Sequence, residues 1–149
     1  FINSFAGKAC AKTGNKPGVT KGKQWIRLNK GLELLDTPGI LWPKFEDQQV
    51  GMRLAFIGSM NDEILIPDEL ACDLIGAIKE LYPKALQERY AADPAGKPIE
   101  ILEAVAESRK CYSKGEQLDL VKASGLLIDD FRSGKLGRMT LERIDSDNE

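Results

Sequence analysis

The sequence predicts a small α/β unit followed by an all-helical domain, with the join near residue 45. Two short apolar runs on either side of a glycine-containing turn indicate a β-hairpin in the first part. Beyond residue 45, apolar residues recur at the three- and four-residue spacing of helices. The charge changes at the same place, from a net +6 over residues 1–45 to a net −8 over residues 46–149. We therefore expect two regions with different partners, the first of them suited to phosphates.

The first region contains the elements of a small α/β unit in a simple order. They are a helix that ends near Gly7, a loop over residues 12–23, and two strands over residues 24–28 and 32–35. Asn29, Lys30 and Gly31 supply the turn chemistry of a hairpin between the strands. The second strand runs into Pro38 and Gly39, which end any regular element.

Four helices are predicted in the second region. Their ranges are about 46–60, 67–82, 101–106 and 117–131, with a linker rich in Ala, Pro, Gly and Asp over residues 90–98. Pro67 suits the first position of its helix, because proline lacks the N–H that a helix start leaves unpaired. The residues expected to face the core are Val50, Leu54 and Ile57 in the first helix, Leu70, Leu74 and Ile78 in the second, and Leu120, Ala123, Leu127 and Phe131 in the last.

Composition excludes several classes of function. The chain has 149 residues and no histidine, so histidine-based acid–base catalysis and histidine-ligated zinc are excluded within it. No run approaches the about 20 apolar residues that a membrane-spanning helix needs, and no membrane span is expected. The three cysteines are far apart and odd in number, which indicates a reducing compartment, and we expect the cytoplasm.

The segment Asp36-Thr37-Pro38-Gly39 is the first candidate for chemistry. Asp36 follows a strand, and the carboxyl ends of strands are where α/β sheets bind ligands. Its carboxylate can hold Mg²⁺ through water, and Gly39 can bring its backbone N–H close to a terminal phosphate. This is the DxxG element of nucleotide-hydrolysing switch proteins. By itself the pattern also describes an ordinary strand-to-turn corner.

The loop before the hairpin is the second candidate. It ends at Thr20, whose hydroxyl can bind Mg²⁺ and whose backbone can contact a γ-phosphate, ordering the loop only when a triphosphate is bound. Lysines at positions 8, 12, 16, 21 and 23 add positive charge around it. Each lysine can equally be part of a solvated basic surface.

Three ordered blocks together resemble the bacterial ribosome biogenesis GTPase A family. They are the run from Asp36 to Asp47 (DTPGILWPKFED), the run from Lys12 to Thr20 (KTGNKPGVT) with Gln24-Trp25, and the closing pair 129–132 (DDFR) and 134–138 (GKLGR). Ordered blocks at compatible spacings are much more specific than one motif.

The resemblance implies a circularly permuted GTPase, in which the guanine-reading motifs and the phosphate-binding loop precede the residues present here. Residues 1–45 would then be the α/β remnant of a permuted P-loop GTPase domain, and residues 46–149 an all-α, RNA-binding domain. Phe1 would directly follow the phosphate-binding loop. The implied function is a GTPase switch in late assembly of the large (50S) ribosomal subunit.

The resemblance also implies the site residues and partners. Thr20 would be the catalytic residue, Thr20, Asp36 and Gly39 would bind the nucleotide, and Thr20 and Asp36 would hold the metal. The cofactors would be GTP and Mg²⁺, with a monovalent cation as a further candidate. The partners would be the large-subunit precursor and its rRNA, and not DNA. Ile40 replaces the glutamine that orients water in many relatives of this fold, so water would be positioned by other means; Ile40 can also simply pack into a core.

Two basic clusters in the helical region are candidates for RNA contact. One comprises Arg132, Lys135 and Arg138 around two glycines, and the other comprises Arg109, Lys110 and Lys114. The alternative for both is a solvated helix end, where basic side chains complement the helix dipole.

Two other functions stay open at this point. The chain can be a non-enzymatic helical module that binds RNA or protein, with its α/β part inert. It can also belong to a sister permuted GTPase that acts on another step of ribosome assembly. The match over residues 41–45 (LWPKF) and the lack of paired cysteines for a zinc domain disfavour the sister protein.

The first prediction concerns nucleotide binding by these 149 residues alone. We expect no GTP hydrolysis and no tight, magnesium-dependent GTP binding, because the phosphate-binding loop and its lysine are not in the sequence. Titration calorimetry tests this directly. A micromolar affinity for GTP would contradict it.

Overall fold

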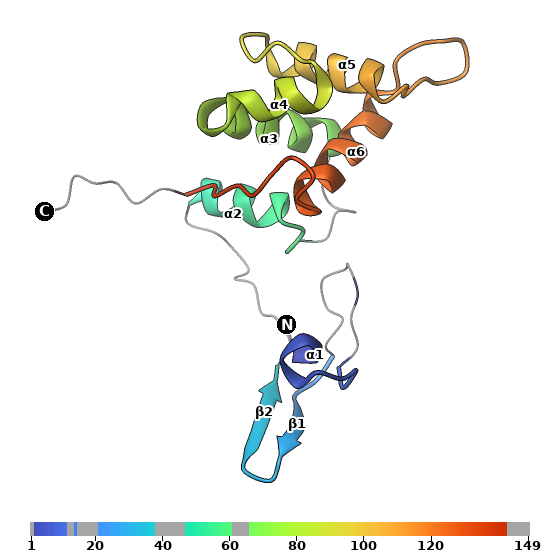
Figure 1. Cartoon of the computed structure of the whole chain (residues 1–149). Helices are drawn as coiled ribbons and strands as arrows, with labels where there is room; N and C mark the ends of the chain where they lie inside the picture. The colour runs from blue at the N-terminus through green and yellow to red at the C-terminus, as the bar shows by residue number, and fades with distance from the viewer. Residues whose placement is uncertain (1, 12–13, 15–20, 38–46, 61–65, 143–149) are drawn as a thin grey trace, which may run out of the picture.

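The computed structural model describes residues 2–11, 14, 21–37, 47–60 and 66–142. In these ranges the chain forms helices and one two-stranded sheet (Figure 1). In chain order the elements are α1 Ile2–Ala6, β1 Gln24–Asn29, β2 Leu32–Asp36, α2 Gln48–Phe56, α3 Pro67–Leu81, α4 Pro83–Tyr90, α5 Pro98–Ser108 and α6 Leu120–Arg132. No helix in the described ranges has the length and apolar character to cross a membrane.

The predicted β-hairpin is confirmed. β1 and β2 are antiparallel, with Gln24 opposite Asp36 and Ile26 opposite Leu34. The side-chain oxygen of Asn29 accepts a hydrogen bond from the backbone N–H of Gly31 at 2.9 Å, which stabilises the turn as the sequence predicts. Ile26 is the buried residue of the hairpin, while Trp25 stays 69% exposed.

Helix α3 lies at the centre of the helical core and packs against α5 and α6. Its predicted inward residues Leu70, Leu74 and Ile78 are all buried. They meet Ile101, Leu102 and Val105 of α5 and the predicted inward residues Ala123 and Leu127 of α6 in one apolar cluster. Pro67 occupies the first turn of α3, with Asp68 and Glu69 beside it at the positive end of the helix dipole.

Helix α2 differs from the prediction in its length and in the residues it buries. It spans nine residues, and its buried side chains are Ala55 and Phe56. The predicted inward residues Val50 and Ile57 are 36% and 57% exposed. Leu54, the third predicted residue, is partly buried. The fully buried residues of α2 lie at its C-terminal end, and Met52 packs against the core from the middle of the helix, so helical spacing alone did not identify the buried residues.

Helix α4 was not predicted from the sequence. Tyr82 leaves the helical conformation, with φ −143° and ψ 56°, and Pro83 then occupies the first turn of a new helix. A proline at this point cannot donate the hydrogen bond that would continue α3. Ala91 ends α4 in the left-handed conformation, so the expected linker over residues 90–98 shortens to residues 91–97.

The buried carboxylate of Asp130 joins the ends of three helices. Its Oδ2 accepts hydrogen bonds from Arg89 at 3.0 Å, from the Tyr90 hydroxyl at 3.0 Å and from Arg109 at 2.7 Å. Lys135 lies 3.3 Å from Oδ1. Burial acts to raise the pKa of Asp130, but hydrogen bonds from Arg89, Tyr90 and Lys135 hold it below its ordinary value. The carboxylate therefore stays ionised at neutral pH.

The second prediction concerns Asp130. Asp130→Asn should lower the free energy of unfolding by about 2–3 kcal/mol, at the low end for a broken buried ion pair because the cations are partly exposed. Asp129→Asn, on the exposed neighbour, should change it by no more than about 0.5 kcal/mol. Denaturant unfolding of both variants at pH 7 makes the comparison. If Asp130→Asn and Asp129→Asn were equally stable, the Asp130 carboxylate would not contribute to holding the helix ends together.

The same variant has an expected pH dependence. A carboxylate whose pKa is lower in the folded state stabilises the fold above its ordinary pKa of 3.8, and that stabilisation is lost as the pH falls through the lower folded value. The stability difference between the unmodified chain and Asp130→Asn should thus be constant from pH 7 to about pH 5 and shrink below about pH 4.

Candidate functional site

Asp36 lies at the carboxyl end of β2, where the sequence predicts it. Gln24, its cross-strand partner, donates a hydrogen bond from Nε2 to Oδ2 of Asp36 at 2.8 Å. Asp36 is half-buried, on the same side of the strand as Leu34. The hairpin therefore orients this carboxylate through both its register and a side-chain hydrogen bond.

The other predicted residues of the nucleotide site, Thr20 and Gly39, lie outside the described residues, and so does Ile40. The structure places Asp36 alone among the residues expected to bind nucleotide and metal. The roles of Thr20, Asp36 and Gly39 remain predictions.

Asn3 ties α1 to the segment that leads into the Thr20 loop. Its Oδ1 accepts hydrogen bonds from the backbone N–H groups of Cys10 at 3.0 Å and Ala11 at 2.8 Å, and its Nδ2 donates to the Ala11 carbonyl at 2.8 Å. Asn3 was not predicted from the sequence. The available signal was an asparagine inside a short helix, since asparagine favours hydrogen bonds to nearby backbone over helix formation.

The donor set at Asp36 suits Mg²⁺. In the described ranges no group of three or more His, Cys, Asp or Glu side chains could hold a metal ion together. Mg²⁺ keeps several waters and commonly takes only one or two protein carboxylates, with phosphate oxygens completing its shell. A single oriented carboxylate is compatible with that ion, and Asp36 would be its ligand.

The predicted RNA-binding cluster divides into an inward and an outward part. Arg132 donates from Nε to the Phe56 carbonyl at 2.9 Å and from Nη2 to the Ala55 carbonyl at 2.8 Å, at the end of α2. Lys135 and Arg138 are exposed. Lys135 keeps 58% of its side-chain surface in solvent although it pairs with Asp130. The structure thus gives Arg132 an intramolecular contact and leaves Lys135 and Arg138 at the surface.

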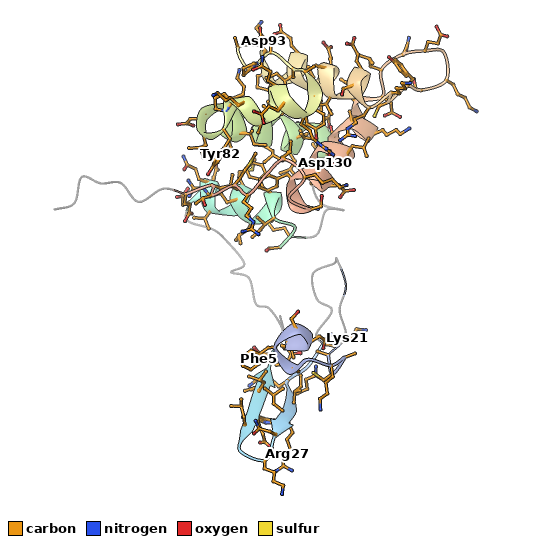
Figure 2. All side chains as sticks on the ribbon, in the orientation of Figure 1. Phe5, Lys21, Arg27, Tyr82, Asp93 and Asp130 are labelled. Atoms are coloured by element: carbon orange, nitrogen blue, oxygen red, sulfur yellow. The ribbon has the colours of Figure 1, made fainter. Side chains whose placement is uncertain are left out.

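The structure also brings together cations from the two basic clusters that lie apart in the sequence. Arg109 follows α5 and Lys135 follows α6, yet both pair with Asp130, as does Arg89 of α4. The guanidinium of Arg109 also lies 5.5 Å from the centre of the Tyr90 ring. Figure 2 labels Asp130 on the helical part of the chain. Three cations around one carboxylate leave positive charge in excess.

Comparison with protein families gives one match over most of the chain. The family model described as 50S ribosome-binding GTPase matches residues 1–103. Similar proteins include Ribosome biogenesis GTPase A of Bacillus cereus, 46% identical over 143 residues, and that of Bacillus pumilus, 40% identical over 147 residues. These matches cover 95% and 98% of the chain but 48% and 52% of the relatives. The chain therefore spans about half the length of the curated relatives it matches.

Two solved structures are similar to the chain in fold. A GDP-bound structure of YlqF from Thermotoga maritima superposes with a TM-score of 0.61, and a GNP-bound one with a TM-score of 0.57. Both are 25% identical to the chain and cover 95% of it, while the chain covers 53% and 54% of them.

The third prediction concerns Asn3. Asn3→Ala removes hydrogen bonds to Cys10 and Ala11, and the amide exchange of these two residues should rise about tenfold or more. Ser4→Ala, at the exposed neighbouring position, is the control and should leave it within about twofold. Hydrogen exchange followed by NMR measures both. Unchanged protection in Asn3→Ala would mean that Asn3 does not hold the start of the loop.

Proposed function

Because the chain belongs to the 50S ribosome-binding GTPase family, we propose that it is part of a GTP-driven switch in assembly of the large ribosomal subunit. In this proposal residues 1–45 complete a circularly permuted P-loop GTPase domain, and residues 46–149 form a helical domain that binds rRNA. The observation that carries it is Asp36, held by Gln24 at the carboxyl end of β2. An oriented carboxylate there is what a DxxG switch element needs.

The proposed chemistry is GTP hydrolysis with Mg²⁺. Thr20 and Asp36 would hold the ion, and Gly39 would donate its backbone N–H to the γ-phosphate. When bound, Mg²⁺ neutralises charge that develops on the phosphates. Asn3 would hold the start of the loop that carries Thr20, which limits the conformations that the loop must give up when GTP binds. A monovalent cation is a further candidate for charge neutralisation.

Exposed apolar side chains on the N-terminal part support a larger sheet. Phe5, Trp25, Leu32 and Leu35 are between 43% and 69% exposed. An isolated two-stranded hairpin is only marginally stable in water, and these side chains would gain stability by burial. We propose that they pack against the part of the GTPase domain that the longer relatives possess.

The helical domain would contact rRNA through phosphates. Lys135 and Arg138 are exposed on the segment that follows α6, and Lys135 is one of the three cations around Asp130. With net −8 over residues 46–149, binding would need such a local concentration of cations. The partner would be a precursor of the large subunit, in the cytoplasm, and its rRNA would provide the phosphates.

The fourth prediction tests the switch, in a protein that carries the complete GTPase domain. It should hold precursor large subunits more tightly with a non-hydrolysable GTP analogue than with GDP, and Gly39→Ala should reduce that difference. Lys135→Gln with Arg138→Gln should weaken binding roughly tenfold with either nucleotide. Lys84→Gln with Lys122→Gln, which remove the same charge from exposed sites elsewhere, should have a smaller effect. Co-sedimentation at fixed salt measures all four proteins.

One outcome of this experiment favours the alternative function. If the unmodified protein binds precursor subunits equally with both nucleotides, a passive RNA-binding module explains the chain better than a switch. If it binds none, the ribosomal partner is wrong.

A further inference from the structure

Arg132 makes its contacts at the point where α2 ends. Its guanidinium reaches the carbonyls of Ala55 and Phe56, 77 and 76 residues away in the sequence. Carbonyls in the last turn of a helix carry the negative end of its dipole, which a guanidinium complements. The contact is charge-assisted at both oxygens and therefore stronger than a neutral hydrogen bond.

Gly58 fits closely under the same guanidinium. A Cβ at this position would lie 3.1 Å from Cζ and 3.2 Å from Nε of Arg132. Gly58 also has φ +73°, in the left-handed region that residues other than glycine rarely adopt. The Arg132 side chain therefore packs closely against the end of α2, where only glycine leaves enough room.

The remainder of α2 is held loosely. A groove of about 360 Å³ lies along it. Its apolar lining consists of Val50, Leu54, Ile57, Phe131, Met139 and Leu141. Across the groove, Arg53 pairs with Glu142 at 2.6 Å, but the Glu142 side chain is 67% exposed, so the pair contributes little to stability. Among the described contacts, the firm attachment of α2 to the bundle is therefore at its C-terminal end.

We propose that Arg132 is a positioning residue that couples α2 to α6 and so transmits the nucleotide state to the helical domain. The proposal rests on the GTPase switch proposed above. Ten residues separate Asp36 from Asp47, whose side chain caps the start of α2 by accepting from the Gln49 N–H at 2.8 Å. A displacement at the nucleotide site would move the N-terminal end of α2. Arg132 would then pass this movement from the C-terminal end of α2 to α6.

Arg132 lies close in sequence to the proposed RNA contact. Arg132 is the last residue of α6, and Lys135 and Arg138 follow within six residues. Nine helical residues span about 13 Å, so α2 can act as a short rigid lever about its C-terminal end. The groove beside it gives the lever room to move without breaking the core of α3, α5 and α6. Arg132 would therefore position α2, whereas the exposed Lys135 and Arg138 would contact RNA.

The fifth prediction begins with hydrogen exchange on the 149-residue chain. Arg132→Gln should raise amide exchange in α2 at least tenfold while that of α3 and α5 stays within twofold, because α2 loses its firm attachment and the core does not. Gly58→Ala should give the same pattern through its clash with the guanidinium. Two controls are matched to these changes: Lys122→Gln removes an exposed charge from α6, and Gly115→Ala adds a methyl group at φ +97° with no atom within 4 Å. Both controls should leave α2 protected.

The second half of the experiment uses the protein with the complete GTPase domain. Arg132→Gln should reduce the ratio of precursor-subunit affinities measured with a GTP analogue and with GDP, and Arg132→Lys should restore part of it. A loosened α2 with an unchanged ratio would make the contact merely structural and overturn the proposal. Equal weakening in both nucleotide states, with α2 still protected, would show that Arg132 contacts RNA directly. A ratio of one in the unmodified protein would defeat the switch itself and not this contact alone.

Discussion

The structure depends on the burial of one carboxylate, Asp130, at the place where α4, α5 and α6 end. A buried charge is costly unless hydrogen bonds and opposite charges compensate for it, and here Arg89, Tyr90, Arg109 and Lys135 all do so. These groups come from three stretches of chain: Arg89 and Tyr90 from the end of α4, Arg109 from the end of α5, and Lys135 from the segment after α6. The carboxylate is therefore compensated where the three helix ends meet.

The last turn of α6 organises two sides of the molecule. Asp130 draws in α4 and the end of α5, and Arg132, two residues later, holds the end of α2. Between them Phe131 packs against the apolar cluster and lines the groove beside α2. The last turn of α6 therefore contacts α2 through Arg132 and the ends of α4 and α5 through Asp130. In the proposed coupling, this contact is the route by which α2, a helix with few buried side chains, would affect the segment that carries Lys135 and Arg138.

Local patterns predicted elements correctly where the determining contacts are near in sequence. The hairpin follows from Asn29 and Gly31 at its turn, and α3 follows from Pro67 at its start and from a regular apolar stripe. Periodicity failed in α2, where the fully buried residues lie at the C-terminal end of a nine-residue helix. α4 was also missed, because the predicted helix stopped at residue 82 and a proline that ends one helix can equally begin the next.

The sequence by itself determined the family and the place of the candidate site in the chain. DTPG after a strand and the ordered blocks around it involve residues close together in the chain, and the structure places Asp36 at the predicted strand end. Only the tertiary structure decided what the charged residues of the helical part do. Arg132 binds the Phe56 carbonyl, 76 residues away, and Arg109 binds the Asp130 carboxylate, 21 residues away, which Lys135 also contacts. A side chain's charge can be read from sequence, but the atom that neutralises it depends on how the helices pack.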